Sequence, residues 1–299
     1  MDISKNYGAL CAYSLADIIC QMKYPSGYAV APVPLTEAIR VPSVDEILEA
    51  HKTIDMMIEI APYYEKFINW EKINSEAEIL VAGGNVFFER VINALDDLGI
   101  DINHAGQVAS ALKAIGAEQL EIAFGVGTSD KNAMRGRIPV RPTSIIQTID
   151  KMQDEVISKQ RFGEKGPLVG TNIVLGSTDV HEFGKEIIKN VLKKAGANVF
   201  DLGTTVSVAE IADMLIETGS NVVLISTYNG IAYSFGKNLL ESLEEANIKD
   251  VHVIMGGRLN EPIDGSDLPV DVSQRLKEMG INTDNDVGTI VELIAAFNK

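Results

Sequence analysis

Cysteine is scarce in this chain, which contains only Cys11 and Cys20 among its 299 residues. The two lie too far apart for a Cys-x-x-Cys pair and have no histidine nearby, so we expect them to pack rather than to form a redox or metal site. The first residues, Met1 to Lys5, lack the charged-then-apolar pattern of a secretory signal. We therefore expect a protein of the reducing cytoplasm.

Long apolar runs are also absent, and no stretch approaches the roughly 20 residues that a membrane-spanning helix needs. Hydrophobic residues make up 46% and charged residues 23% of the chain, which is the ordinary globular mixture. The net charge of −16 argues against a polyanionic ligand. We expect neither a membrane nor nucleic acid as a partner.

Arg135, Arg137 and Arg141 stand out in a polar stretch of this acidic chain. The stretch is either a solvated loop or a contact for an acidic substrate or partner.

A length of 299 residues favours two domains. We predict an N-terminal α/β module over residues 1–160 and a second domain over residues 167–299. In the first, Ser43 and Glu46 form a capping box that opens a helix. Short apolar runs ending near glycines predict strands over 77–84 and 119–126, and helical spacing predicts helices over 44–60, 86–98, 106–115 and 143–158.

The second domain alternates short apolar runs with amphipathic stretches. The runs predict strands over 172–175, 198–201, 221–226 and 251–255, each followed by a helix. This alternation is typical of a doubly wound parallel sheet, Rossmann-like and flavodoxin-like. Ligands of such sheets lie at the carboxyl ends of the strands, so the loops there are the candidate site.

The first of these loops carries Asp179 and His181, with Gly184 at the start of the next helix. A neutral imidazole is a good ligand for a transition metal, and a carboxylate on its other ring nitrogen fixes the tautomer. Gly184 allows a helix to begin against a bulky ligand without a side chain between them. His51, His104 and His252 offer no second site by their spacing.

The motif Asp179-x-His181-x-x-Gly184 after the first strand resembles the cobalamin-binding signature of methionine synthase, methylmalonyl-CoA mutase, glutamate mutase and corrinoid methyltransferase proteins. The resemblance implies that His181 is the lower axial ligand of cobalt, with Asp179 behind it. It also implies that the nucleotide tail of cobalamin is displaced into a pocket of the sheet, the base-off/His-on mode.

Further elements of the resemblance follow in order along the chain. Ser226 retains the serine of a Ser-x-Leu element without the leucine, Gly256-Gly257 matches a pair after the fourth strand, and Gly288-Thr289 matches a pair at the last helix. The cofactor-binding residues implied in this way are Ser177, Thr178, Asp179, His181, Gly184, Ser226, Tyr228, Gly230, Gly256, Gly257, Gly288 and Thr289.

Within the family, the stretches 176–181 and 226–236 look most like the small subunit of glutamate mutase. This likeness implies a cobalamin-carrying subunit of an adenosylcobalamin-dependent mutase, which performs radical carbon-skeleton rearrangement. At 299 residues the chain is too short to hold this domain and a barrel of about 250 residues. We therefore expect a separate substrate-binding barrel subunit, no catalytic residue in this chain, and an N-terminal module that contacts a partner or the cofactor. A homo- or hetero-oligomer is left open.

Three alternatives remain. The first is a corrinoid protein, which would carry methyl groups on methylcobalamin. The stretch Asp201-Leu202-Gly203 resembles one in methionine synthase and favours this alternative. The α/β pattern over 77–126 argues against it, because such proteins usually carry an all-helical N-terminal cap. An aminomutase subunit would need a lysine eleven residues after His181, where Leu192 stands with Lys193 beside it. A cobalamin carrier or sensor without enzymatic activity would bind the cofactor in the same way.

Overall fold

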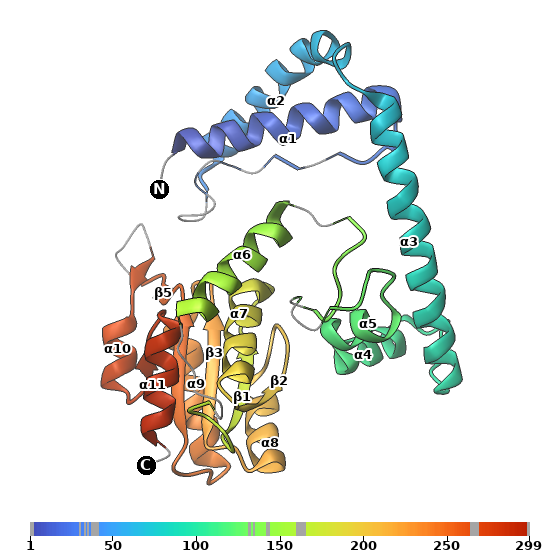
Figure 1. The fold of residues 1–299 in the computed structure, drawn as a ribbon. Coiled ribbons are helices and arrows are strands. Elements are labelled where there is room, and N and C mark those ends of the chain that lie inside the picture. Colours follow the sequence, from blue (N-terminus) through green and yellow to red (C-terminus); the bar gives the residue numbers. More distant parts are fainter. Residues whose placement is uncertain are drawn as a thin grey trace. The chain divides into compact units, whose positions relative to one another are not determined.

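The computed structural model describes residues 3–29, 31–32, 34, 36, 42–130, 133, 135–141, 144–159, 166–263 and 269–297, so most of the stretch between the two predicted domains lies outside it. The helices and strands are shown in Figure 1, and none of the described helices is long and apolar enough to cross a membrane. In chain order they are α1 (Ile3–Lys23), α2 (Val44–Glu65), α3 (Trp70–Asp97), α4 (Ala105–Ile115), α5 (Ala117–Phe124), α6 (Ser144–Lys159), β1 (Asn172–Ser177), α7 (Glu182–Lys194), β2 (Asn198–Asp201), α8 (Val208–Thr218), β3 (Val222–Thr227), α9 (Ala232–Glu245), β4 (His252–Gly257), β5 (Asn260–Glu261), β6 (Val270–Asp271), α10 (Ser273–Glu278), β7 (Asn282–Thr283) and α11 (Val287–Phe297).

The chain divides into two compact units. The smaller consists of Met1–Ala77 with Pro262–Pro269, and the larger of Glu78–Glu261 with Val270–Lys299. In the smaller unit α1 packs on α2, where Leu10 and Ala50 are buried. The capping box of α2 is present as predicted, because the Ser43 hydroxyl accepts from Glu46 N and the Glu46 carboxylate accepts from Ser43 N.

The two strands predicted in the N-terminal half are wrong. Residues 77–84 lie inside the 28-residue helix α3, and residues 119–126 fall largely in α5. A short apolar run cannot be told from a helix segment by periodicity alone, and glycines inside a helix cost only about 1 kcal/mol each. Leu80 and Val81 are more than half exposed, as on the surface of a helix. The described part of the N-terminal half is therefore helical, not α/β.

The predicted parallel sheet is confirmed. Five strands are arranged in the order β2-β1-β3-β4-β7, and every neighbouring pair in this sheet is parallel. The sequence prediction missed β7, whose two residues are too few to give a pattern, and the small antiparallel pair β5-β6. The order is that of the flavodoxin-like doubly wound fold.

Alternate residues of the strands point to opposite faces of the sheet. Val174, Val223 and Met255 pack with the helices α8, α9 and α10, whereas Ile173, Leu224 and Ile254 pack with α7 and α11. The chain therefore leaves β1 for a helix on one face and leaves β3 for a helix on the other. Since β1 and β3 are neighbours, their two loops diverge at the carboxyl ends of these strands, which is where the ligand crevice of such a sheet lies.

Candidate functional site

His181 lies in the crevice between β1 and β3. β1 ends at Ser177, three residues form the loop, and His181 is the N-cap of α7 with no side-chain capping bond of its own. The imidazole is therefore not used to cap its helix. Its side chain is 58% exposed, so the ring faces outward at the end of the sheet.

Asp179 holds the His181 ring from behind. Its Oδ1 accepts the His181 backbone N–H at 2.8 Å and lies 2.8 Å from His181 Nδ1, and its Oδ2 accepts the Tyr228 backbone N–H at 2.7 Å. Burial opposes ionisation of Asp179, but these hydrogen bonds outweigh it and hold the pKa of the carboxyl below its usual range. A carboxylate at Nδ1 favours the tautomer with the proton on that nitrogen, which leaves Nε2 with a lone pair that could bind a metal.

Tyr228 covers one side of the imidazole. The two ring centroids are 4.6 Å apart with the planes tilted by 42°. The Arg258 guanidinium lies over the Tyr228 ring, 5.4 Å from its centroid. The loop after β3 is thus tied to the His181 loop twice, through the Tyr228 amide and through its ring.

The predicted contacts Ser177 and Thr178 lie behind the histidine rather than beside it. Both side chains are buried, Ser177 completely. The Thr178 hydroxyl donates to Thr227 Oγ1 at 2.9 Å, and the Thr178 amide donates to Ser226 O at 2.9 Å. These residues brace the end of β1 against β3, so they support the site from inside the sheet.

The glycines of the site differ in what surrounds them. At Gly184 the nearest atom to an added Cβ would be Ser226 Oγ at 4.0 Å, an ordinary contact distance, so no contact within the chain requires glycine at this position. At Gly256 an added Cβ would lie 2.7 Å from Asp284 O, and at Gly257 2.3 Å from Thr227 O. Contacts within the chain therefore suffice to explain the Gly256-Gly257 pair, whereas they do not explain Gly184.

The remaining predicted residues lie in neighbouring loops. Gly230 has φ of +76°, as its turn after β3 requires. Gly288 and Thr289 belong to the first turn of α11, but the Thr289 amide and hydroxyl already donate to Asp286 Oδ1 at 2.8 and 3.1 Å. A phosphate or ribose could take these donors only by displacing Asp286.

Three apolar side chains around His181 were not predicted as part of the site. Val180 is 75% exposed, and Phe183 and Ile231 are also exposed although each is large and apolar. Val180 and Phe183 occupy variable positions of the motif, and Ile231 lies at the start of α9. Their apolar character was therefore the only signal in the sequence that could have identified them. Exposed apolar side chains gathered at a crevice are typical of a binding surface.

The arrangement suits a metal whose other ligands come from a planar cofactor. Among the described residues, no group of three or more His, Cys, Asp or Glu side chains could hold a metal ion. His181 offers one nitrogen, supported by a carboxylate, next to an exposed apolar surface and to Gly184, where no contact within the chain requires glycine. A corrin would bring its own nitrogen ligands to cobalt and would need a single further nitrogen from the protein, which His181 could supply, so the residues present fit cobalamin.

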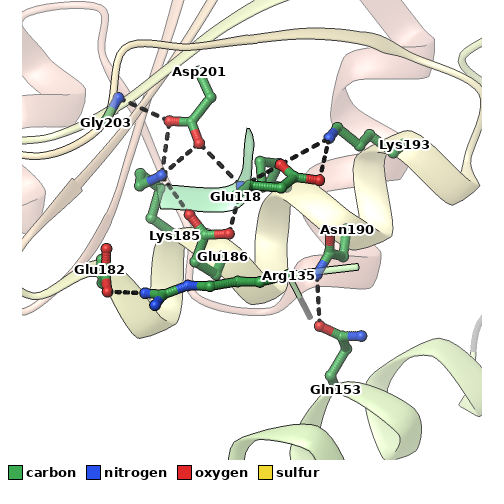
Figure 2. A network of polar contacts seen from close by, with 11 residues as sticks. Glu118, Arg135, Gln153, Glu182, Lys185, Glu186, Asn190, Lys193, Asp201 and Gly203 are labelled. Carbon is green, nitrogen blue, oxygen red and sulfur yellow. Dashed lines mark hydrogen bonds and ion pairs between the residues drawn. The ribbon is translucent and has the colours of Figure 1, made fainter. Parts of the chain in front are cut away.

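Two arginines of the polar stretch make contacts within the chain, and one of them lies next to the site. Arg135 pairs with Glu182, the residue after the histidine, while Arg137 donates to the carbonyls of Glu121, Ile122 and Gly127. Arg135 and Arg137 are thus bound within the chain rather than only solvated. Figure 2 shows Arg135 directed toward Glu182 beside a larger polar network that the sequence did not reveal.

Comparison with known proteins gives matches to cobalamin proteins. The family model of the B12 binding domain matches residues 172–262. The glutamate mutase sigma subunit of Carboxydothermus hydrogenoformans is 33% identical over 123 residues, covering 40% of this chain and 88% of that protein. The sigma subunit of Clostridium tetanomorphum is 31% identical over 129 residues, 42% of this chain and 92% of that protein. The dimethylamine corrinoid protein of Methanosarcina barkeri is 32% identical over 98 residues, 32% of this chain and 46% of that protein.

Proposed function

The chain belongs to the B12-binding family that includes the glutamate mutase sigma subunits, and we propose that it is a cobalamin-carrying subunit that binds its cofactor base-off with His181 on cobalt. The observation that carries the proposal is the Asp179–His181 pair at the crevice between β1 and β3. Cobalamin is the cofactor for which this pair, the apolar rim and the glycine at position 184 are all useful.

In this proposal each residue has a definite task. His181 Nε2 would ligate cobalt, while Asp179 keeps the proton on Nδ1 and increases the basicity of the ring. Tyr228 restrains the ring through its contact at 4.6 Å. The nucleotide tail would pass between Gly184 and Ser226, because Gly184 is a glycine of the site that no contact within the chain requires.

The first candidate reaction is that of an adenosylcobalamin-dependent mutase, shared with a separate substrate-binding subunit. It is supported by the extent of the similarity, since this chain spans 88% and 92% of two sigma subunits. This chain would hold and orient the cofactor, and the partner would bind substrate and exclude water. When bound, adenosylcobalamin would supply radical chemistry, whereas methylcobalamin would supply a transferable methyl group.

The second candidate is a corrinoid protein that carries methyl groups between methyltransferases. The strands predicted over 77–84 and 119–126 argued against it, and those residues are helical. A helical N-terminal half and the 32% identity to a dimethylamine corrinoid protein both favour this candidate. The secondary structure of the N-terminal half therefore no longer favours the mutase over the methyl carrier.

The aminomutase alternative has no support in the helix after His181. Leu192 occupies the position where that alternative needs a lysine, and it is completely buried in the core. The neighbouring Lys193 is 42% exposed and pairs with Glu118 at 3.3 Å. Neither side chain is placed to form a covalent bond with a second cofactor in the crevice.

Two measurements test the proposal. Purified protein titrated with aquocobalamin should give the absorbance change of histidine coordination, and His181→Ala should abolish it; an unchanged spectrum in the variant would refute His181 as ligand. Cofactor isolated with the native protein should then be photolysed in the presence of oxygen. An adenosine-derived product would support the mutase, and formaldehyde from a methyl group would support the methyl carrier.

A further inference from the structure

The first turns of α7 contain an unusual concentration of buried charge. Lys185 and Lys189 are each only 2% exposed and Glu186 5%, although lysine and glutamate are almost never buried unless paired. Lys185 Nζ donates to both carboxylate oxygens of Asp201, at 2.7 and 2.6 Å, and to Glu186 Oε1 at 2.8 Å. Figure 2 shows Lys185 between these two carboxylates.

The two lysines, Lys185 and Lys189, are paired with the two acids, Glu186 and Asp201. Lys189 pairs with Glu186, with Asp201 at 3.2 Å and, at the outer side, with Glu118 of α5 at 3.0 Å. Burial raises the pKa of Asp201, but the two lysines outweigh this and keep it below its usual range. The Asp201 carboxyl is therefore ionised at neutral pH, as its ion pairs with the two lysines require.

Stability alone is a poor reason for such a network. The cost of removing ions from water often exceeds the attraction between them, and well-packed apolar residues of similar size are commonly as stable. Buried ion pairs are better suited to fixing one geometry among several. Their position in the fold then indicates which geometry they fix.

The network joins the ligand-bearing turn to the edge of the sheet. Lys185 follows Gly184 directly, so its side chain leaves the first turn of the helix that His181 caps. Asp201 is the last residue of β2, and its Oδ1 also accepts the Gly203 amide at 2.9 Å. Gly203 O in turn accepts the amide of Ser177, at the end of β1, at 3.0 Å. The start of α7 is thus connected to the ends of β1 and β2.

We propose that Lys185 and Asp201 are positioning residues whose ion pair fixes the first turn of α7, and with it His181 and Gly184, before cobalamin binds. The effect on cobalt ligation rests on the proposed function. The effect on the position of the turn does not, because it is a property of the protein without cofactor. Neither residue touches cobalt. Their effect on ligation is exerted through the position of the helix.

The test uses a double variant that leaves no unpaired buried charge. Lys185→Met alone would leave Asp201 with only its longer contact to Lys189, at 3.2 Å, and a poorly compensated buried ion can prevent folding. Lys185→Met with Asp201→Asn removes one positive and one negative charge, keeps an acceptor for the Gly203 amide, and leaves Lys189 paired with Glu186. Lys193→Met is the matched control, because Lys193 lies on the same helix but is 42% exposed and does not reach Asp201.

Three quantities are compared in the three proteins: hydrogen exchange, cobalamin affinity and the histidine-coordinated fraction. Hydrogen exchange without cofactor should be about tenfold faster at amides 186–190 of the double variant. The double variant should also bind aquocobalamin about tenfold more weakly, which is the lower end of the effect expected for residues that orient a metal ligand. At saturating aquocobalamin, the histidine-coordinated fraction should also be lower. Lys193→Met should match the wild type in all three, and far-ultraviolet circular dichroism checks that each protein is folded.

The possible results separate the two claims. Unchanged exchange at amides 186–190 in the folded double variant would overturn the positioning role, whatever the affinity. Faster exchange with unchanged affinity and coordination would also overturn it, since the turn would then not determine ligation. If the wild type fails to bind cobalamin, the proposed function is wrong, and the exchange measurement still decides whether the pair fixes the turn.

Discussion

Asp179→Asn replaces the group behind His181 with one of nearly equal size. The Asp179 carboxylate accepts three short hydrogen bonds, from the His181 amide, the His181 ring and the Tyr228 amide, and a longer one from the Thr178 hydroxyl at 3.4 Å. Asparagine keeps one accepting oxygen and presents an NH2 group in place of the other. Because Asp179 is 8% exposed, water cannot replace the lost acceptor.

The size of the effect follows from this count. If the asparagine oxygen faces His181, its NH2 group opposes the Tyr228 N–H, and one buried donor loses its acceptor. Such a loss costs about 1–3 kcal/mol, equivalent to roughly 5- to 150-fold in the folding equilibrium. The neutral amide also makes the His181 ring a weaker base, so cobalamin affinity should fall about 10- to 100-fold.

Urea unfolding without cofactor measures the first effect, and titration with aquocobalamin measures the second. Asp213→Asn is the control, since Asp213 is exposed on α8 away from the crevice. We expect the Asp179 variant to unfold at lower urea and to bind more weakly, and the control to match the wild type. If Asp179→Asn equals the wild type in both assays, the hydrogen bonds of the site do not support His181.

Two further predictions concern the scaffold. Hydrogen bonds from Ser207 and Lys113 lower the pKa of Glu210 from 4.5 to about 2, so its contribution to stability is complete above pH 4.5 and is lost as the pH falls toward 2. Glu210→Gln should therefore make the decline in urea stability over this pH interval shallower. An equally steep decline in the variant would contradict the assignment. Gly257→Ala should destabilise the protein by about 1–3 kcal/mol in urea unfolding, because φ is +97° and the new Cβ would lie 2.3 Å from Thr227 O. Gly84→Ala, inside α3 with open space around it, should instead stabilise by about 0.5–1 kcal/mol, and equal effects at the two glycines would be contrary to this account.

The sheet and the Asp179–His181 pair were predictable because their determinants are local. Apolar runs bounded by glycines identify the strands of the larger unit, and two residues that are two positions apart after a strand must share a loop. Tyr228 was predicted as a cofactor contact from resemblance. That it also donates its amide to Asp179 depends on the pairing of β1 with β3 and could not be read from spacing.

The failures have physical causes of their own. Residues 77–84 have the composition of a strand but continue a helix on both sides, and only the longer context distinguishes the two. Lys185 and Lys189 look like a solvated helix face, because the sequence does not show that Asp201, twelve and more residues later, lies beneath them. Gly256 and Gly257 were predicted as cofactor contacts from resemblance, and the close backbone contacts around them are a second reason for glycine that the sequence does not show.

The most direct test of the central claim is paramagnetic resonance of the protein with reduced cobalamin after labelling its four histidines with 15N. If His181 ligates cobalt, the nitrogen hyperfine pattern should change from that of 14N to that of 15N in the wild type, and the 15N pattern should be absent in labelled His181→Ala. A pattern that remains that of 14N in the labelled wild type would mean that the benzimidazole of the cofactor is still bound to cobalt, and the base-off, His-on account would be wrong.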